Sequence, residues 1–308
     1  MNKLSLVVPV FNEEEVILQF LKETRVELKK LKITHEYVFV DDGSRDGTVA
    51  ILRQEAKKDP RVKLVALSYN HGKAYAFSAA IEHASGDYLL YMDPDLQDPP
   101  KEIPRFYHEA QKGYDLVWGV RRTKEDSWWN RQWSRLFWKS LNGLTGLQIP
   151  KGIAVMRIFN KEFAREMCKY REANRFIEGI FSAISKKWTV LEVDQRPRFA
   201  GVTKFNFRKK INLALDAIFD FSEVPLKITV HLGMVLTGLG FFALVLLVSL
   251  KIFLIHFQAG WPSIIASLIM MFGIQIFFLG IMSIYIGKIY KEVKGRPLYS
   301  VKEKINLS

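Results

Sequence analysis

Three acidic residues stand within six positions of the segment YMDPDLQDPP, residues 91–100, directly after an apolar run. Carboxylates that share a site repel and raise each other's pKa, so the grouping of Asp93, Asp95 and Asp98 suggests a cation. Residues two apart in an extended stretch point to the same side, and Asp93 and Asp95 can therefore face one hard cation such as Mg²⁺ or Mn²⁺. The alternative is that Asp-Pro-Asp only forms a turn.

A second acidic string, Asp41-Asp42-Gly43-Ser44, also follows an apolar run. Such a string is typical of a turn and a helix N-cap. Two acidic strings at the ends of two predicted strands weaken the purely structural interpretation of each.

Predicted strands and helices alternate along the chain around these residues. Apolar, β-branched runs predict strands at residues 4–11, 36–40, 62–68 and 87–92, and amphipathic segments predict helices within 12–31, 41–56 and 72–84, the first with acids in its first turn. This order predicts an α/β fold with a mainly parallel sheet, whose ligands gather at the carboxyl ends of the strands. The polar groups that follow the strands are Asn12-Glu13, Asp41-Asp42-Gly43-Ser44, Asn70-His71-Gly72-Lys73 and Asp93-Pro94-Asp95. We expect them to converge on one crevice.

Charge is distributed unevenly between the two parts of the chain. The formal net charge is +13, of which residues 1–120 contribute −3 and residues 121–308 contribute +16. A basic half can serve nucleic acid or anionic lipid. The sequence shows no zinc-finger spacing, no heptads beside a basic region and no RNA-binding aromatic signature, and we expect no nucleic-acid partner. The single cysteine, Cys168, excludes an internal disulfide and a cysteine-built metal site.

Two apolar segments lie in the basic half. Residues 228–250 contain no charged side chain, and residues 262–287 form a second long apolar run. About 20 apolar residues suffice to cross a bilayer as a helix, and the alternative of buried core helices is weaker because such helices are shorter and have a polar face. Lysine and arginine flank the pair on its outer sides, as Lys204, Arg208, Lys209, Lys210 and Lys227 before it and Lys288, Lys291, Lys294 and Arg296 after it.

This bias predicts that both outer flanks are cytoplasmic. The N-terminal apolar run is too short for a signal peptide. We therefore expect a multi-pass protein of the cell (inner) membrane, with the catalytic domain and both termini in the cytoplasm.

Five segments, LSLVVPVFNEEE, VFVDDGSRDGT, NHGKAYAFSAAI, GDYLLYMDPDLQDPP and RFAGVTKFNFRKKINLALDAI, resemble glycosyltransferase family 2 in order and spacing. More narrowly they are similar to polyprenyl-phosphate sugar transferases, the bactoprenol glucosyltransferases and dolichol-phosphate mannose synthases, and the ending GKIYKEVKGRPLY is similar to the bactoprenol branch. The resemblance implies a Rossmann-like GT-A domain that uses a nucleotide sugar and a divalent metal to glycosylate a lipid phosphate with inversion. It also makes a homo-oligomer plausible.

The resemblance implies roles for some individual residues, and the positions of Lys73, Asp98, Arg122, Arg131 and Arg135 in the sequence suggest roles for the others. The expected nucleotide-binding residues are Pro9, Asn12, Glu13, Asp41, Asp42 and Lys73. Asp93 and Asp95 would hold the metal, and Asp93, Asp95, Asp98 and Arg157 form the expected catalytic set. The expected lipid-phosphate-binding residues are Arg122, Arg131, Arg135, Arg198 and Lys204.

One position departs from the family. Where relatives commonly read Gly-Asp-Phe-Arg-Leu, with the acid discussed as a catalytic base, this chain has Ala154-Val155-Met156-Arg157-Ile158. A lipid monophosphate has a second pKa near about 6 and is already a nucleophile at cytoplasmic pH. We therefore expect Val155 to lower activity less than its position suggests, with an altered acceptor or an inactive protein as alternatives.

The segment SWWNRQWSRLFWKSLNGL, residues 127–144, interleaves tryptophans with basic residues. Large aromatics and cations together are what an interfacial helix needs, so we expect this helix to lie on the cytoplasmic leaflet and to guide the lipid phosphate through Arg131 and Arg135. A buried aromatic helix edge is the alternative.

The expected organisation is a nucleotide-sugar-binding core at 1–120, an acceptor-binding and membrane-surface section at 121–227, a transmembrane hairpin at 228–287 and a tail at 288–308. The expected reaction transfers a hexose, with glucose from UDP-glucose as the first choice, to undecaprenyl phosphate. The alternatives are a family 2 enzyme with another lipid or glycan acceptor and a non-catalytic membrane homologue that only binds nucleotide sugar.

Overall fold

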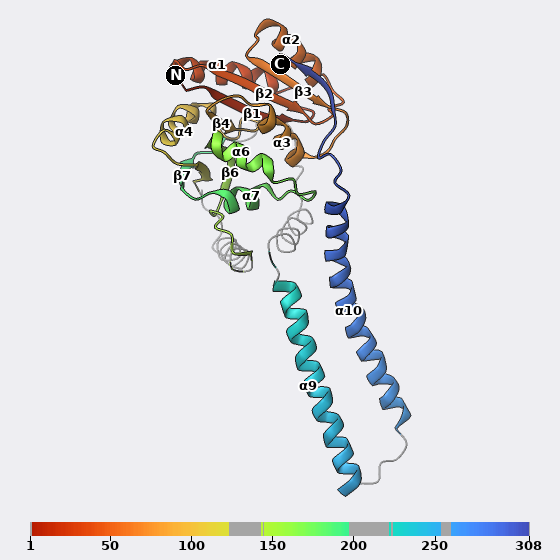
Figure 1. Cartoon of the computed structure of the whole chain (residues 1–308). Coiled ribbons are helices and arrows are strands. Elements are labelled where there is room, and N and C mark those ends of the chain that lie inside the picture. Colours follow the sequence, from red (N-terminus) through yellow and green to blue (C-terminus); the bar gives the residue numbers. More distant parts are fainter. Residues whose placement is uncertain are drawn as a thin grey trace.

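The computed structural model describes residues 2–122, 143, 145–196, 222, 224–253 and 260–307 (Figure 1). Its strands are β1 (Leu4–Val10), β2 (His35–Asp41), β3 (Val62–Leu67), β4 (Tyr88–Tyr91), β5 (Leu116–Arg121), β6 (Ile153–Asn160), β7 (Trp188–Val193) and β8 (Val301–Ile305). Its helices are α1 (Ile17–Leu31), α2 (Thr48–Lys58), α3 (Lys73–His83), η1 (Pro100–Glu102), α4 (Ile103–Ala110), α6 (Lys161–Lys169), α7 (Ile177–Ile184), α9 (Val224–Phe253) and α10 (Trp261–Val293).

The eight strands in the described residues form one sheet in the order β7-β5-β6-β4-β1-β2-β3-β8. The four strands predicted from the sequence are its parallel centre, β4-β1-β2-β3. Strand β6 runs antiparallel to both β4 and β5, and β8 runs antiparallel to β3, so the complete sheet is mixed. Because the central strands are parallel neighbours, the polar residues that follow them lie at one edge of the sheet.

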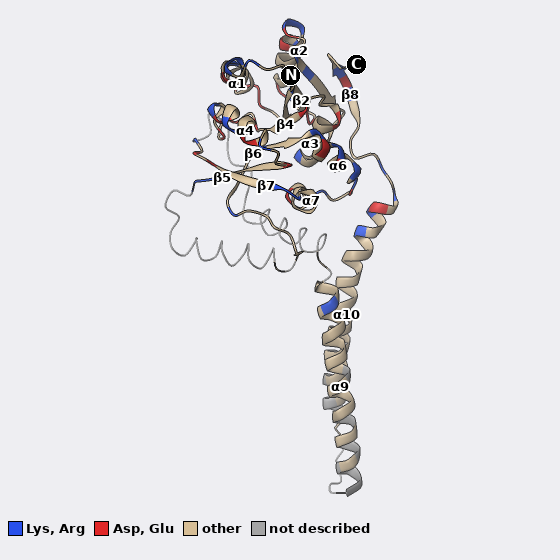
Figure 2. Cartoon of the chain, turned by 60° about the vertical axis from the view of Figure 1, so that its left-hand side comes forward, with Lys and Arg blue, Asp and Glu red and all other residues tan. Residues whose placement is uncertain are grey.

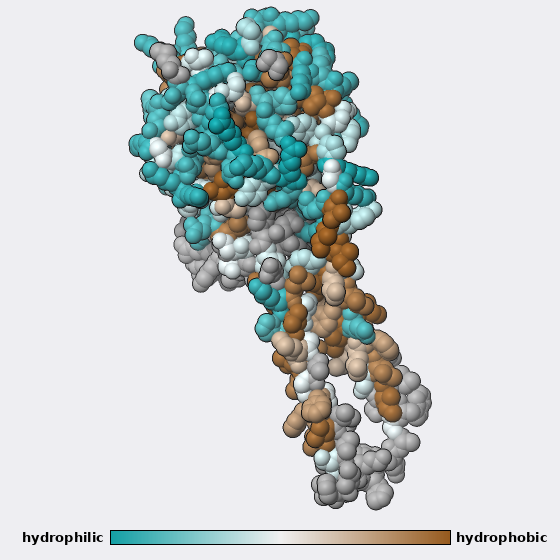
Figure 3. Space-filling model, in the orientation of Figure 1, coloured by the Kyte–Doolittle hydropathy of each residue, from teal (hydrophilic) through white to brown (hydrophobic). Residues whose placement is uncertain are grey.

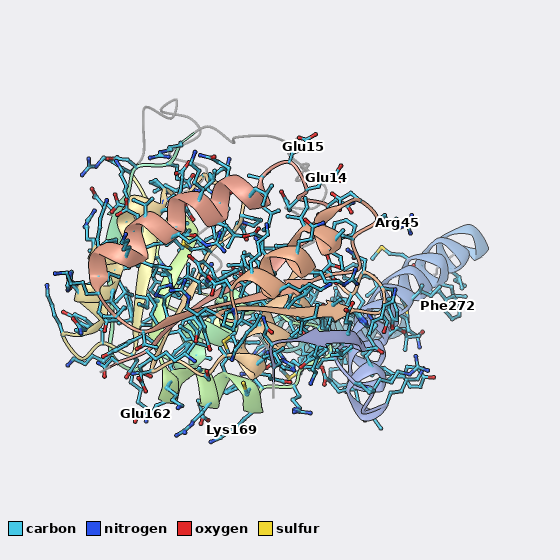
Figure 4. The ribbon with its side chains drawn as sticks, turned by 90° about the horizontal axis from the view of Figure 1, so that it is seen from above. Glu14, Glu15, Arg45, Glu162, Lys169 and Phe272 are labelled. Atoms are coloured by element: carbon cyan, nitrogen blue, oxygen red, sulfur yellow. The ribbon has the colours of Figure 1, made fainter. Side chains whose placement is uncertain are left out.

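Helices cover both faces of the sheet. Strand β1 shows the division, because Leu4, Leu6, Val8 and Val10 belong to one core cluster whereas Val7 belongs to the other. The first cluster includes buried residues of α1, α2 and α4, and the second includes those of α3, α6 and α7. Figure 4, seen from above, shows α1 on one side of the sheet and α6, marked by Glu162 and Lys169, on the other. The domain is a three-layer α/β/α sandwich.

Helix α1 begins later than the sequence pattern predicts. It starts at Ile17 and carries no acid in its first turn. The preceding acids serve another purpose: Oε2 of Glu14 accepts a hydrogen bond of 2.6 Å from the N–H of Gly47, and the N–H of Glu13 donates to Oγ1 of Thr48 at 2.8 Å. The segment after β1 is therefore fastened to the start of α2, which shapes the crevice edge.

Strand β8 belongs to the segment expected to be only a tail. It pairs with β3 and covers what would otherwise be an open sheet edge. The segment before it is also fixed, because the carbonyl of Ser300 accepts a hydrogen bond of 2.8 Å from the N–H of Ser68. The side chain of Asn306 donates to the carbonyls of Ala56 and Val62, at 2.7 and 2.9 Å. The last described residues are thus part of the α/β domain.

Helices α9 and α10 project from this domain as a pair (Figure 1). Two stretches, Val224–Phe242 and Met270–Val293, are long and apolar enough to cross a membrane, and neither window is buried inside the structure. Figure 3 shows hydrophobic residues along the pair and hydrophilic ones over the α/β domain. The charged residues of α10, Lys288, Lys291 and Glu292, lie at the end nearest the sheet (Figure 2). Exposed apolar helices that lie far from the N-terminus fit a membrane anchor better than a soluble core or a signal sequence.

Four expected lipid-phosphate ligands, Arg131, Arg135, Arg198 and Lys204, lie outside the described residues, as do the tryptophans of the predicted interfacial helix.

Candidate active site

A pocket of about 490 Å³ opens at the carboxyl edge of the sheet. Residues at or just after the ends of β1, β2 and β3 line it, including Asn12, Asp41 and Asn70, and α2 and β8 supply its remaining walls. Strand β4 lies on the other side of β1, so Asp93 is placed further along the same edge, outside the pocket lining. The site is therefore elongated, with a pocket at the β2–β3 end and the acidic β4 loop at the other.

Asp41 ends β2 and is 1% exposed. Its Oδ2 accepts a hydrogen bond of 3.0 Å from the N–H of Ser44, whereas its buried Oδ1 has no hydrogen-bond partner within the described part of the chain. Burial raises the pKa of Asp41, against the lowering effect of the hydrogen bonds from Ser44. A buried acceptor without a donor is costly, and in a pocket wall it is suited to a ligand N–H.

Asp42 organises the next loop. Its two oxygens accept hydrogen bonds from the N–H groups of His71 and Gly72, at 2.7 and 2.9 Å. Burial raises the pKa of Asp42 and these two donors lower it. The φ angle of Gly72 is +111°, which favours glycine, and α3 starts at the next residue. Asp42 thus positions the loop that carries Lys73, and a direct contact with nucleotide stays a prediction.

Asn12 lines the pocket from the β1 side. Its N–H donates to Oγ of Ser44 at 2.8 Å, and its Oδ1 accepts from the N–H of Arg45 at 2.9 Å. Its φ angle of 55° lies in the left-handed region, which asparagine tolerates better than most residues. Pro9 lies inside β1, beyond the last β4 pairing at Val7, where its missing N–H breaks no ladder bond to β4. Of the nucleotide-binding residues expected in and after β1, Asn12 lines the pocket, whereas Pro9 and Glu13 are not among the lining residues.

Lys73 and Asp93 form an ion pair at the other end of the site. Nζ of Lys73 lies 2.5 Å from Oδ2 of Asp93, and 5.7 Å from the ring centroid of Tyr91. Desolvation lowers the pKa of Lys73, but the charges of Asp93 and Tyr91 and the hydrogen bonds to them together outweigh it and raise the pKa above its usual range. The other oxygen of Asp93, Oδ1, is buried and has no hydrogen-bond partner among the residues described. The carboxylate of Asp93 therefore pairs with Lys73 through Oδ2, while its Oδ1 is still able to accept a bond.

The loop after Asp93 is held in a strained form. Oδ1 of Asp95 accepts from the N–H of Gln97 at 3.1 Å, and Leu96 between them has a φ angle of 58°. A left-handed leucine costs about 1–2 kcal/mol, and such strain is typically kept at functional sites. Asp98 is 3% exposed, and its oxygens accept from the N–H of Met156 and from Nε2 of Gln195, both at 2.7 Å. These contacts make Asp98 a positioning residue for the loop, and its expected direct role in catalysis stays a prediction.

Arg157 is 2% exposed although it is charged. Its Cζ lies 4.9 to 5.4 Å from the ring centroids of Trp118, Phe181 and Tyr91. Nε donates to the carbonyl of Val155 at 3.1 Å, and Nη2 lies 3.4 Å from Oε1 of Glu178.

Nη1 of Arg157 is buried and has no hydrogen-bond partner in the described residues. Arginine suits such a cage because its planar guanidinium is weakly hydrated and stacks on rings. Sequence reasoning missed Glu178, because nothing in the local pattern links α7 to β6.

Arg122, the one expected lipid-phosphate ligand inside the described residues, is exposed and pairs with carboxylates. Nε lies 3.1 Å from Glu192 and Nη1 lies 3.4 Å from Asp194. The segment that leads toward Arg198 begins beside the acidic loop, because the N–H of Arg196 donates to the carbonyl of Gln97 at 2.9 Å. Lipid-phosphate binding by these residues stays a prediction.

The residues present fit a divalent metal in the β4 loop. Asp93 and Asp95 offer the hard oxygen ligands that Mg²⁺ and Mn²⁺ prefer, and Oδ1 of Asp93 is an acceptor still to be satisfied. The described residues contain no group of three or more potential ligands among His, Cys, Asp and Glu. This agrees with a metal that takes only one or two protein carboxylates and completes its coordination with substrate phosphates and water.

The three-layer fold with acidic loops at the strand ends is of the GT-A type found in glycosyltransferases. The model of glycosyl transferase family 2 matches residues 5–168, which span β1 to α6. The chain belongs to this family, as its sequence motifs predicted.

Three curated relatives cover nearly the whole chain. The chain is 35% identical over 300 residues to the uncharacterized glycosyltransferase YkcC of Bacillus subtilis, covering 97% of this chain and 93% of the relative. It is 36% identical over 304 residues to the SfII prophage-derived bactoprenol glucosyl transferase of Shigella flexneri, covering 98% of each. It is 32% identical over 312 residues to the undecaprenyl-phosphate 4-deoxy-4-formamido-L-arabinose transferase of Proteus mirabilis, covering 99% of this chain and 95% of that protein.

Proposed function

We propose that this protein is a membrane-bound inverting glycosyltransferase that moves a hexose from a UDP-sugar to polyprenyl phosphate. Glucose from UDP-glucose is the first choice of donor, and undecaprenyl phosphate is the acceptor. The proposal is supported by relatives of near full length whose names include bactoprenol and undecaprenyl phosphate, and by the two apolar helices, which are long enough to anchor the domain in a bilayer.

One observation carries the proposal: two carboxylate oxygens at the same sheet edge, Oδ1 of Asp41 and Oδ1 of Asp93, are buried with no partner in the described residues. A nucleoside diphosphate with a divalent cation on its phosphates would satisfy both ends of such a site, the base at Asp41 and the cation at Asp93. Its base offers an N–H to Asp41 in the pocket, and its diphosphate reaches the β4 loop. Uracil suits Asp41 because its N3–H is a donor, whereas the corresponding nitrogen of cytosine is an acceptor.

Asp93 and Asp95 would hold Mg²⁺ or Mn²⁺, which when bound supplies electrostatic stabilisation of the diphosphate. Lys73, beside Asp93, is placed to contribute a second positive charge at the leaving group. An oxygen of the acceptor phosphate attacks the anomeric carbon from the face opposite the leaving diphosphate. The bond from that carbon to the diphosphate oxygen breaks, and the electron pair leaves with UDP. The product is a polyprenyl-phosphate sugar of inverted configuration.

This reaction needs no carboxylate base at position 155. The second pKa of a phosphate monoester is near about 6, so the acceptor is already an anion at pH 7. The chain's task is to hold it in line with the anomeric carbon. Arg157 supports this end of the site by fixing β6 against Tyr91, the residue that precedes the acidic loop.

Lys and Arg flanks favour an arrangement in which the catalytic domain and both termini face the cytoplasm. The α/β domain lies at the end of α10 that carries Lys288 and Lys291, in agreement with this topology. A homo-oligomer and the division of the chain at residues 120 and 227 are part of the same proposal, whereas the segment after α10 rejoins the α/β domain through β8.

The test uses the full chain purified in detergent, undecaprenyl phosphate, Mg²⁺ or Mn²⁺ and a panel of UDP-, GDP- and CDP-sugars. Mass spectrometry is expected to detect a lipid-linked hexose from UDP-glucose, absent with an Asp95→Asn variant. Turnover that does not depend on the polyprenyl phosphate would point to another acceptor. Nucleotide-sugar binding without turnover from any donor would favour a non-catalytic homologue.

A further inference from the structure

The pocket at the β2–β3 end has a wall that no family motif supplies. Lys302 and Glu303 of β8 line it, opposite residues of the β1 and β2 ends such as Asn12 and Asp41. The family match ends at residue 168, so this wall comes from a segment far outside the matched region. Between that region and β8 the chain passes through both apolar helices.

The wall is held in a defined position. Strand β8 pairs with β3 in a register that sets Glu303 opposite Ala66 and Val301 opposite Leu67, with an irregularity between them. The N–H of Ser300 donates to Nε2 of His71 at 3.2 Å, which ties β8 to the loop ordered by Asp42. The pocket wall and the loop before Lys73 therefore form one connected structure.

An arginine fork fixes Glu303 on the pocket side of β8. Nε and Nη2 of Arg53, from α2, donate to Oε1 and Oε2 of Glu303 at 3.2 and 2.7 Å. Both residues line the pocket. A bidentate pair has a single preferred geometry, so Glu303 is occupied and the strand cannot slide along β3 without breaking the pair.

Lys302 differs from Glu303 in its interactions. It is exposed, lines the pocket and forms no ion pair with any residue that the structure describes. Arg45 is a second such cation, and it projects from the β2–α2 loop at the crevice edge (Figure 4). Oδ1 of Asp41 is thus a buried acceptor without a partner in the described residues, and Lys302 and Arg45, which form no ion pair there, line the same pocket. Uracil presents the complementary pattern, an N3–H donor between two carbonyl acceptors.

We propose that β8 forms a wall of the base-binding pocket and that Lys302 is a specificity-determining residue that donates to the carbonyl edge of the base. This inference rests on the proposed function, because it takes the ligand to be a uridine nucleotide. Its new element is that the C-terminal strand, which follows the second membrane helix, takes part in recognising the donor.

The test measures UDP binding to the full chain in detergent by isothermal titration. Lys302→Ala is expected to weaken UDP binding about threefold to tenfold, the effect of losing one charge-assisted hydrogen bond in a partly exposed site. Lys304→Ala is the matched control. It removes the same residue type from the same strand two positions later, outside the pocket lining, and is expected to leave affinity unchanged.

Competition with uridine, which carries no phosphate, distinguishes a contact between Lys302 and the base from a general attraction of Lys302 for phosphate. Lys302→Ala is expected to weaken the binding of uridine by the same factor as the binding of UDP. If uridine is unaffected while UDP weakens, or if Lys302→Ala and Lys304→Ala both behave as wild type, the inference is overturned and the proposed function stands. If the wild-type protein binds no UDP, the proposed function fails and this inference fails with it.

Discussion

Oδ2 of Asp93 lies 2.5 Å from Nζ of Lys73, so the first acid after β4 already carries a cation contributed by α3. A metal that binds Asp93 must share this carboxylate with Lys73. The pair joins the start of α3 to the loop after β4, twenty residues further along the chain, and places a positive and a negative charge side by side at the β4 end of the site.

Replacing Lys73 is expected to separate metal binding from turnover. In Lys73→Met the carboxylate of Asp93 is released, and Mn²⁺ measured by electron paramagnetic resonance is expected to bind about tenfold more tightly. Turnover is expected to fall, because a positive charge at the leaving diphosphate is lost. Lys112→Met, which removes an exposed pair with Glu109, is the control. Unchanged or weaker Mn²⁺ binding in Lys73→Met would contradict competition for Asp93.

Even a conservative substitution of Arg157 is expected to impair the protein. Lysine keeps the charge but is strongly hydrated, and it lacks the planar group that stacks among Tyr91, Trp118 and Phe181. Arg157→Lys is expected to lower turnover more than about tenfold and to lower Tm. The exposed Arg105→Lys is expected to change neither. Wild-type turnover and Tm in Arg157→Lys would show that the aromatic cage is not needed.

The valine at position 155, where relatives commonly have aspartate, is expected to cost the protein little turnover. Val155→Asp is expected to change turnover less than about threefold, since the acceptor phosphate needs no base. The measurement is the initial rate of lipid-linked sugar formation at pH 7. Tm is expected to fall, because Val155 packs against the core cluster that contains Tyr91 and Phe181. A large gain in turnover would show that a carboxylate base had been missing.

Glu36 is expected to stabilise the domain only above acidic pH. It is 2% exposed and pairs with Lys3 and Lys63, and it accepts hydrogen bonds from Ser5 and Ser85. Burial raises the pKa of Glu36, but the hydrogen bonds, first that from Lys3, lower it to about 2.

A depressed pKa means that the stabilisation is complete above the unfolded pKa of 4.5 and is lost as pH falls toward about 2. The shift corresponds to a contribution on the order of 3 kcal/mol at pH 7. Glu36→Gln is expected to lower Tm at pH 7, with the difference from wild type shrinking below pH 4.5. Glu109→Gln, at an exposed pair, is the control. A Tm difference that does not depend on pH would contradict the ionic origin.

The sequence predicts the centre of this fold well because the central strands are continuous apolar runs and their polar ends are unmistakable. It does not predict β8, since VKEKI is an exposed edge strand with no apolar run, and only its pairing with β3 identifies it. The late start of α1 is hidden because the carboxylate of Glu14 is used by Gly47, a contact between distant residues. For the same reason the Arg157–Glu178 pair cannot be read from either segment alone.

Strand β8 also sets an order of events during synthesis. The ribosome makes β3 early, but its partner emerges only after both apolar helices have left the ribosome. Until then the edge of β3 is open, and an open edge can pair with other chains. The pocket therefore gains its last wall only after both apolar helices have been made, and the final residues of the chain close a sheet whose first strands were made at the start.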